Sequence, residues 1–283
     1  MPNSIVFVKQ VPDTSNITSN AMKEDGTVNR AVLPTIFNPD DLHALEAALE
    51  LKDRYGGKVT VVSMGPPKAA EILRDTLYRG ADRAILITDR RAAASDTLAT
   101  SYILSQAVRT IADYDFIFAG RQAIDGDTAQ TAPQCAEKLG IPQVTCLTEI
   151  IELDANIATV KRDIGNGWEI LKVRLPALFT VVESANTPRT WSAKNMMRRK
   201  NNRIATEITT EQIDSYKSAG RLMEQWNLDD IGADINRCGS SGSPTKVFRI
   251  QSVVLTKEGY TDIPPTQEGI AELIREVVSI KTV

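Results

Sequence analysis

The segment from Ala119 to Ala132 combines residue types that bind nucleotides with a place in the chain where nucleotides commonly bind. Its sequence, AGRQAIDGDTAQTA, follows a short apolar run typical of a strand and opens a run typical of a helix. Backbone N–H groups at such a turn, together with the helix dipole, attract a pyrophosphate. Further partners are supplied by the side chains of Asp125, Asp127, Thr128 and Gln130. An acidic turn followed by a helix N-cap explains Gly126 and Asp127 without any ligand, so spacing alone leaves both interpretations open.

Further candidate binding residues stand at strand ends and helix starts in the first part of the chain. They are Asn38, Asp41, Met64, Asp96, Thr97 and Thr100. Asn38 precedes Pro39 at a helix start and Asp41 lies in the first turn, and spacing alone favours a cap and a solvated first-turn residue over ligand contact. The methionine ends an apolar strand, a position that lines an α/β crevice, although methionine more often fills core gaps. The last three begin another helix, where capping and ordinary packing are the alternatives to ligand contact.

Hydrophobic periodicity predicts the elements that position these residues. Apolar runs indicate strands at residues 5–8, 59–64, 84–87 and 116–118. Helical spacing indicates helices at about 38–54, 72–79 and 96–111. Strands and helices alternating at this spacing imply right-handed crossovers and an α/β fold with a doubly wound parallel sheet. The expected fold resembles an adenine-nucleotide hydrolase domain.

The pattern changes to β structure after Pro142. Strands are indicated at 144–153, 157–163, 168–175 and 177–182. Turn residues at 165–167 predict a hairpin that extends the sheet. Beyond about residue 200 the chain is polar and rich in glycine and serine, with a short strand at 247–254 and a helix at about 266–280. Since such a segment cannot form a core alone, we predict a nucleotide-binding domain at 1–200 and a C-terminal arm at 201–283 that packs on a partner subunit.

Composition argues against several classes of function. The 33 Lys+Arg and 36 Asp+Glu residues nearly balance, which argues against nucleic acid as a bulk electrostatic partner. Three widely spaced cysteines and a single histidine argue against a metal centre. The N-terminus has no charged leader or long apolar run, so we expect a cytoplasmic protein without membrane insertion. No arrangement of nucleophile and base is apparent, and we predict no catalytic side chain.

The nucleotide-loop segment resembles that of the β subunit of electron-transfer flavoproteins. Four other segments agree with that family in order and spacing: residues 8–13, 38–41, 63–66 and 80–83. Together the similarity covers roughly residues 4 to 200. The runs DGDTAQ at 125–130, SMG at 63–65 and SDTLATS at 95–101 are similar to the electron-bifurcating branch. The β subunits of that branch hold FAD where the ordinary branch holds AMP. The resemblance implies cofactor contacts at Phe7, Asn38, Asp41, Met64, Asp96, Thr97, Thr100, Asp125, Gly126, Asp127, Thr128, Ala129, Gln130 and Thr131.

The same resemblance implies a function and a set of partners. NADH would deliver a hydride to the FAD of this subunit. The electrons would then divide between ferredoxin or flavodoxin and, through a second FAD on an α subunit, an acyl-CoA dehydrogenase-type enzyme. Docking on that enzyme is implied for residues 189–197, with Trp191 and Met196 as anchors and Ala193 where the ordinary branch often has leucine. The alternatives are an ordinary carrier β subunit that holds AMP and a stand-alone ATP-binding protein of the universal-stress type.

Overall fold

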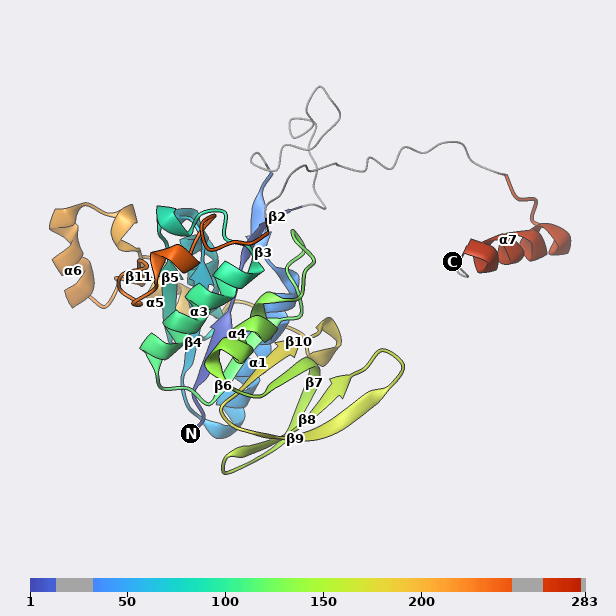
Figure 1. The fold of residues 1–283 in the computed structure, drawn as a ribbon, viewed down its shortest axis with the longest axis horizontal. Coiled ribbons are helices and arrows are strands. Elements are labelled where there is room, and N and C mark those ends of the chain that lie inside the picture. The colour runs from blue at the N-terminus through green and yellow to red at the C-terminus, as the bar shows by residue number, and fades with distance from the viewer. Residues whose placement is uncertain (14–32, 246–261, 281–283) are drawn as a thin grey trace, which may run out of the picture.

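A nine-stranded sheet forms the centre of the computed structural model, in the order β11-β5-β4-β1-β6-β10-β7-β8-β9 (Figure 1). The structure describes residues 1–13, 33–245 and 262–280. Neighbouring strands are parallel from β11 to β7, whereas β8 and β9 are antiparallel. The strands are β1 (Ser4–Phe7), β4 (Val59–Met64), β5 (Arg83–Ile87), β6 (Phe116–Gly120), β7 (Gln143–Asp154), β8 (Ile157–Asp163), β9 (Trp168–Arg174), β10 (Ala177–Val181) and β11 (Glu224–Trp226). A separate antiparallel pair is formed by β2 (Gln10–Pro12) and β3 (Thr35–Phe37).

Helices cover both faces of the sheet. On one face α1 (Pro39–Tyr55) and α2 (Ala70–Arg79) share a buried apolar cluster with side chains of β1, β4 and β6. On the other face α3 (Thr97–Ile111) and α4 (Thr131–Leu139) share a second cluster with the alternate side chains of the same strands. Because successive strand residues point to opposite faces and both faces are covered, these strands are mostly apolar, with buried Ser4, Thr60 and Ser63 as the polar exceptions. The predicted doubly wound α/β sheet is confirmed.

The β-hairpin extension lies at one edge of this sheet. β8 pairs with β7 and β9, and Asp163 is opposite Trp168 across the turn. Gly165 in that turn has a φ of +87°, a conformation that favours glycine. The turn residues therefore predicted both the position of the hairpin and its addition to the sheet.

Residues 201–245, the first part of the predicted C-terminal arm, pack on the same domain in this chain. β11 pairs in parallel with β5 at the far edge of the sheet. Met223, Leu228 and Ile231 are buried beside it. These apolar residues are sparse in the sequence, but they are enough to cover an edge that the preceding elements have already formed. Two short helices occur in or just before this stretch, α5 (Ala193–Arg199) and α6 (Ile213–Ser218).

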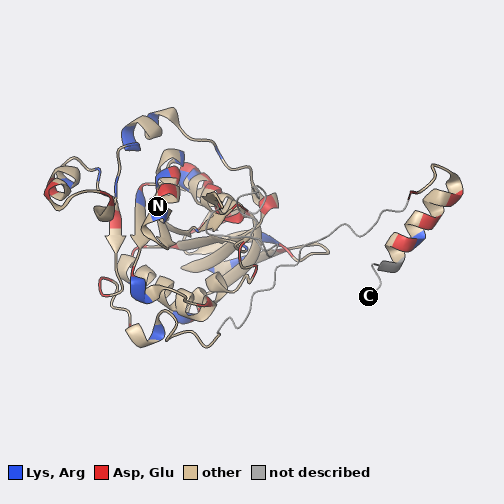
Figure 2. Ribbon diagram, turned by 90° about the horizontal axis from the view of Figure 1, so that it is seen from above, with Lys and Arg blue, Asp and Glu red and all other residues tan. Residues whose placement is uncertain are grey.

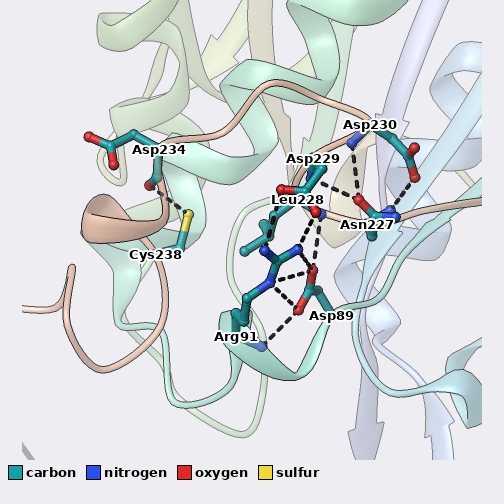
Figure 3. Close-up of polar contacts among 8 residues, drawn as sticks. All are labelled: Asp89, Arg91, Asn227, Leu228, Asp229, Asp230, Asp234 and Cys238. Carbon is teal, nitrogen blue, oxygen red and sulfur yellow. Dashed lines mark hydrogen bonds and ion pairs between the residues drawn. The ribbon is translucent and has the colours of Figure 1, made fainter.

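A charged network fixes this segment to the loop after β5 (Figure 3). Asp89 accepts hydrogen bonds from the Arg91 guanidinium, at 2.6 Å, and from the Leu228 backbone N–H, at 3.2 Å. Arg91 also pairs with Asp229, at 2.7 Å. The hydrogen bond from the Arg91 side chain is the main reason that the pKa of Asp89 falls to about 2, despite the opposing effect of burial. A carboxylate before α3 thus holds a segment more than a hundred residues later in the chain.

The C-terminal helix α7 (Gln267–Ile280) stands apart from the sheet and its helices (Figure 1). Its apolar side chains repeat at helical spacing and are about half exposed: Ile270, Leu273, Ile274, Val277 and Val278. Acidic residues lie along the same helix (Figure 2). This confirms the helix expected at about 266–280, whereas the strand expected at 247–254 lies outside the described residues. No helix among the described residues is long and apolar enough to cross a membrane.

Candidate functional site

The candidate site lies where the direction of the fold reverses, at the carboxyl ends of β1 and β6. β1 pairs with β4 on one side and with β6 on the other, so the chain leaves β1 toward one edge and returns at β6 toward the opposite edge (Figure 1). Such a switch point opens a crevice in which α/β sheets bind ligands. The predicted nucleotide segment, Ala119–Ala132, takes in the end of β6, the loop of residues 121–130 that we call the nucleotide loop, and the start of α4. The structure therefore places the loop where the sequence predicted it.

Asn38 holds this loop in position. Its side chain is fully buried and makes no capping hydrogen bond to α1, although it occupies the N-cap position. Instead, Nδ2 donates to the Gln122 carbonyl at 2.9 Å, and Oδ1 accepts from the Ile124 N–H at 3.1 Å. The interpretation of Asn38 as a simple cap is therefore wrong. Its amide serves as the bridge between α1 and the nucleotide loop.

Asp41 joins three elements beneath the crevice. One carboxylate oxygen accepts from the Lys9 N–H at 2.8 Å, just after β1, and the other accepts from the Gly120 N–H at 3.1 Å, at the end of β6. The side chain is 7% exposed, so its interpretation as a solvated first-turn residue is wrong. Burial raises the pKa of Asp41 to about 7, against the hydrogen bonds from Asn38, Lys9 and Gly120.

Gly120 is a requirement of this site that the sequence interpretation missed. A Cβ atom there would lie 2.5 Å from the Asp41 carboxylate and 2.7 Å from the backbone of Asp40. Only glycine lets β6 and the start of α1 approach this closely. Gly126, which the sequence favoured, has no such constraint, because its φ is not left-handed and a Cβ would meet no atom within 4 Å. The only sequence signal for Gly120 was its position at the exit of the apolar strand β6.

The start of α4 provides free backbone donors. Its N-cap, Gln130, makes no side-chain capping bond. The N–H groups of Thr131 and Ala132 have no acceptor in the part of the chain that the structure describes. Just before them, Asp127 and Ala129 adopt left-handed φ angles of 47° and 53°, a conformation that is unfavourable for alanine. Uncapped donors and the positive end of the helix dipole suit a phosphate group.

The acidic side chains of the loop are directed to protein partners. Asp125 pairs with the Lys9 ammonium at 2.7 Å, across the mouth of the crevice. Asp127 accepts from the Gln122 side chain at 3.0 Å. Because Lys9 offsets one negative charge of the loop, it favours the approach of an anion to the helix start. Lys9 was absent from the predicted contacts, although it directly follows the apolar strand.

The start of α3 forms the opposite wall. Asp96 caps the helix by accepting from the Ala99 N–H at 3.0 Å, and it also accepts from the Thr245 N–H at 3.1 Å. Burial raises the pKa of Asp96, but these backbone donors outweigh it and leave the pKa below its ordinary value. Thr97 donates to the Gln130 side chain at 3.0 Å, which joins α3 to the nucleotide loop. Asp96 is thus a cap, and Thr97 and Gln130 meet as a pair.

The remaining predicted residues have less specific surroundings. Phe7 ends β1 and is buried. Met64 ends β4 and is half-buried against the same apolar cluster, so both lie at the carboxyl edge where the prediction put them. Thr100 is half-buried in the first turn of α3. Thr128, Ala129 and Gln130 are exposed at the loop surface.

The predicted docking residues lie together, away from the crevice. Trp191, Ala193 and Met196 line a hollow at α5, beside Arg79 of α2. Among the described residues, no cluster of three or more His, Cys, Asp or Glu side chains is arranged to hold a metal ion.

Comparison with known proteins places these observations in a family. Residues 25–210 match the family model described as electron transfer flavoprotein domain. The chain is 39% identical over 275 residues to the electron transfer flavoprotein subunit beta of Clostridium acetobutylicum, covering 97% of each chain. It is 39% identical over 282 residues to protein FixA of Sinorhizobium fredii, covering 97% of this chain and 92% of that protein. It is 41% identical over 246 residues to the caffeyl-CoA reductase-Etf complex subunit CarD of Acetobacterium woodii, covering 87% and 86%.

Proposed function

This chain belongs to the electron transfer flavoprotein family, in the role of a β subunit, and on that premise we propose that it is the FAD-binding β subunit of an electron-bifurcating heterodimer. The family assignment covers residues beyond 200, which the stand-alone ATP-binding alternative left unexplained. CarD is named as part of a complex with a CoA-ester reductase, which supports a partner enzyme of that class for this chain. A cytoplasmic location, where NADH is at hand, is part of the same proposal.

The start of α4 is the observation that carries the nucleotide part of the proposal. Its uncapped N–H groups at Thr131 and Ala132 fit a phosphate of the cofactor. FAD bound there would supply the redox chemistry, namely acceptance of a hydride from NADH and release of single electrons toward ferredoxin or flavodoxin and toward the FAD of the α subunit.

The side chains of this subunit hold and orient rather than react. Asn38 and Asp41 keep the nucleotide loop against β6, and Lys9 offsets the charge of Asp125 beside the phosphate seat. The Thr97 and Gln130 pair ties the two helix starts that face the crevice. Each of these contacts fixes donors before the cofactor arrives, which lowers the ordering cost of binding.

An α subunit is the proposed partner of α7. The apolar stripe at Ile270, Leu273 and Ile274 is about half exposed in this chain, and burial against another subunit would remove that area from water. Val253 and Val254 belong to the arm that we predict to pack on the partner, and they lie outside the described residues. The segment 189–197 is the proposed contact with the acyl-CoA dehydrogenase-type enzyme that receives the second electron.

The experiment that tests the proposal is a cofactor count on the purified αβ complex, followed by NADH oxidation. Two FAD per heterodimer are expected, with turnover that requires ferredoxin together with the dehydrogenase and its enoyl-CoA substrate, which is the high-potential electron acceptor. One FAD and one AMP, without direct reaction with NADH, would establish the carrier alternative instead. FAD and AMP share a phosphate and an adenosine group, so the seat at α4 serves either one and the count must decide.

A further inference from the structure

A pocket of about 440 Å³ lies between α3, α4 and the glycine- and serine-rich segment near residue 240. None of the residues that line it belongs to the nucleotide loop, and none of them is acidic. Its volume is in the range of small-molecule sites. The residues that matter for its chemistry are Leu98 and Tyr102 of α3, Lys138 of α4, and Arg237, Ser241 and Pro244 from the later segment.

The glycine- and serine-rich run at 239–244 forms a fixed wall of this pocket. A Cβ atom at Gly242 would overlap the backbone of Arg237, so only glycine lets the run close on the preceding turn. The Asp96 N–H at the start of α3 donates to the Ser243 hydroxyl at 2.8 Å. That hydroxyl donates in turn to a carbonyl of the same run at 2.7 Å. The composition that suggested a polar arm therefore builds a cavity wall on α3.

Arg237 brings a positioned positive charge to the pocket. Its guanidinium carbon lies 3.9 Å from the centroid of the Tyr102 ring, and that ring is buried. The Tyr102 hydroxyl accepts from the Asp234 N–H at 2.9 Å, which fixes the ring. The Asp234 carboxylate accepts from the backbone and side-chain N–H groups of Asn236, at 3.0 and 3.1 Å. Stacking on the ring thus holds the guanidinium while the neighbouring carboxylate is engaged elsewhere.

Lys138 adds a second cation to the same lining. Within residues 1–13, 33–245 and 262–280, neither Lys138 nor Arg237 forms an ion pair. In contrast, Arg91, which precedes α3, pairs with both Asp89 and Asp229. Two cations in one pocket repel each other, and an anion placed between them turns that repulsion into attraction. Guanidinium and ammonium groups together are the donors that commonly bind phosphate.

Apolar surface lies in the same pocket beside the two cations. Leu98 is 41% exposed although it is a large apolar residue, and Pro244 is also exposed. The exposed Ser241 adds a hydroxyl donor to the lining. A lining with positive charge and apolar surface side by side, without a carboxylate, suits a ligand that carries a phosphate group on a flat apolar ring.

We propose that this pocket is a second ligand site, which binds a phosphate monoester with a flat ring, such as a nucleoside monophosphate. The phosphate lies between Arg237 and Lys138, and the ring lies against Leu98 and Pro244. This site is separate from the crevice of the nucleotide loop. The inference therefore holds whether that crevice contains FAD or AMP.

The test is calorimetric titration of the purified αβ complex, with its bound cofactors, using AMP, adenosine and glucose 6-phosphate as probes. AMP should bind at least about tenfold more tightly than adenosine, which lacks the phosphate, or glucose 6-phosphate, which lacks the flat ring. Arg237→Gln and Lys138→Gln should each raise the Kd for AMP about tenfold, because each removes a charged partner of the phosphate. Lys217→Gln, which changes an exposed cation on α6, is the control and should leave the Kd unchanged.

A filling variant tests the cavity independently of charge. Ser241→Phe should abolish AMP binding, whereas Ser240→Phe, equally exposed but outside the lining, should not. Both variants should melt at the wild-type temperature, since both positions are exposed. If the wild-type complex does not bind AMP at millimolar concentration, or if Arg237→Gln and Ser241→Phe bind it as tightly as the wild type, the second site is wrong.

Two further outcomes would also overturn the proposal. If Gln130→Asp weakens AMP binding and the pocket variants do not, the probe occupies the nucleotide crevice instead. If adenosine or glucose 6-phosphate binds as tightly as AMP, the assigned ligand class is wrong. The flavin count that tests the proposed function is a separate measurement, so either idea can fail without the other.

Discussion

Gly120 and Gly126 flank the same short loop and form a natural pair of test positions. At Gly120 a methyl group would lie 2.5 Å from the Asp41 carboxylate and 2.7 Å from the Asp40 backbone. At Gly126 it would meet nothing within 4 Å. Gly120→Ala should therefore displace the start of α1 from the end of β6, whereas Gly126→Ala should be tolerated.

The magnitude follows from two effects of the added methyl group at Gly120. Overpacking a tight contact costs roughly 1–3 kcal/mol, and losing the hydrogen bond from the Gly120 N–H to the Asp41 carboxylate costs about 1.5–3 kcal/mol. One displacement causes both, so they overlap, and we expect a total of about 2–4 kcal/mol. For a chain of this size that lowers the melting temperature by roughly 4–16 °C. Gly126→Ala should change stability by about 0 to +1 kcal/mol, since alanine restricts the unfolded chain.

The assay is thermal unfolding of the αβ complex, together with its nucleotide content. In Gly120→Ala the shift of Asp40 and Asp41 also loosens the loop, because Asp40 accepts from the Gln122 N–H at 3.3 Å. Lower melting temperature and lower nucleotide occupancy should therefore appear together. Equal melting temperatures for the two variants would refute the close approach of β6 and α1 as the reason for glycine at position 120.

Three further predictions concern other parts of the molecule. The pKa of Asp41 is about 7 in the folded protein and about 4 in an unfolded chain. Between these pH values only the folded protein keeps the proton on Asp41, so the stability that depends on this proton is complete below about pH 4 and is lost as pH rises through about 7. Asp41→Asn should flatten this pH dependence of the melting temperature, and an unchanged profile would contradict the assignment. Asp89→Ala removes the carboxylate that accepts hydrogen bonds from Arg91 and Leu228. The backbone amides of residues 224–238 should then exchange with deuterium faster than in the wild type or in the surface control Asp113→Ala. Equal exchange rates would show that the network in Figure 3 does not hold the segment. The double variant Ile270→Glu/Ile274→Glu should reduce recovery of the α subunit in co-purification, whereas Glu272→Gln on the opposite face of α7 should not. If the double variant recovers as much α subunit as the wild type does, α7 is not part of the interface.

Local sequence signals were enough for the regular elements of the fold. Pro39 after Asn38 fixed the start of α1, and Gly80 fixed the end of α2. The doubly apolar strands and the turn glycines near 165 predicted the sheet and its hairpin. Each of these features depends on residues within one element or its immediate neighbours, which is the range over which periodicity and capping rules apply.

The contacts that build the site join residues far apart in the chain, and no local rule reaches them. Asn38 occupies a cap position, but its amide finds stronger partners on a loop 84 and 86 residues later. Lys9 reaches Asp125 across 116 residues. The same limit applies to β11, since its short run EQW becomes a strand only because the edge of β5 offers unpaired backbone groups.

Two kinds of residue are mixed in the predicted contact list, and the structure separates them by what they already bind. Asn38 and Asp41 are buried and their polar atoms are engaged by protein donors and acceptors, so they support the loop without needing a ligand. The N–H groups of Thr131 and Ala132 instead remain without an acceptor among the described residues. Replacing a supporting residue should lower both the stability of the cofactor-free protein and nucleotide affinity, because the loop loses its anchor in either state. Filling the α4 start, for example with Gln130→Asp as a competing cap, should weaken nucleotide binding, and it should leave the cofactor-free protein at least as stable as Thr97→Val, which breaks the same Thr97–Gln130 hydrogen bond without adding a cap. These two readouts together distinguish a residue that contacts the cofactor from one that holds the fold around it.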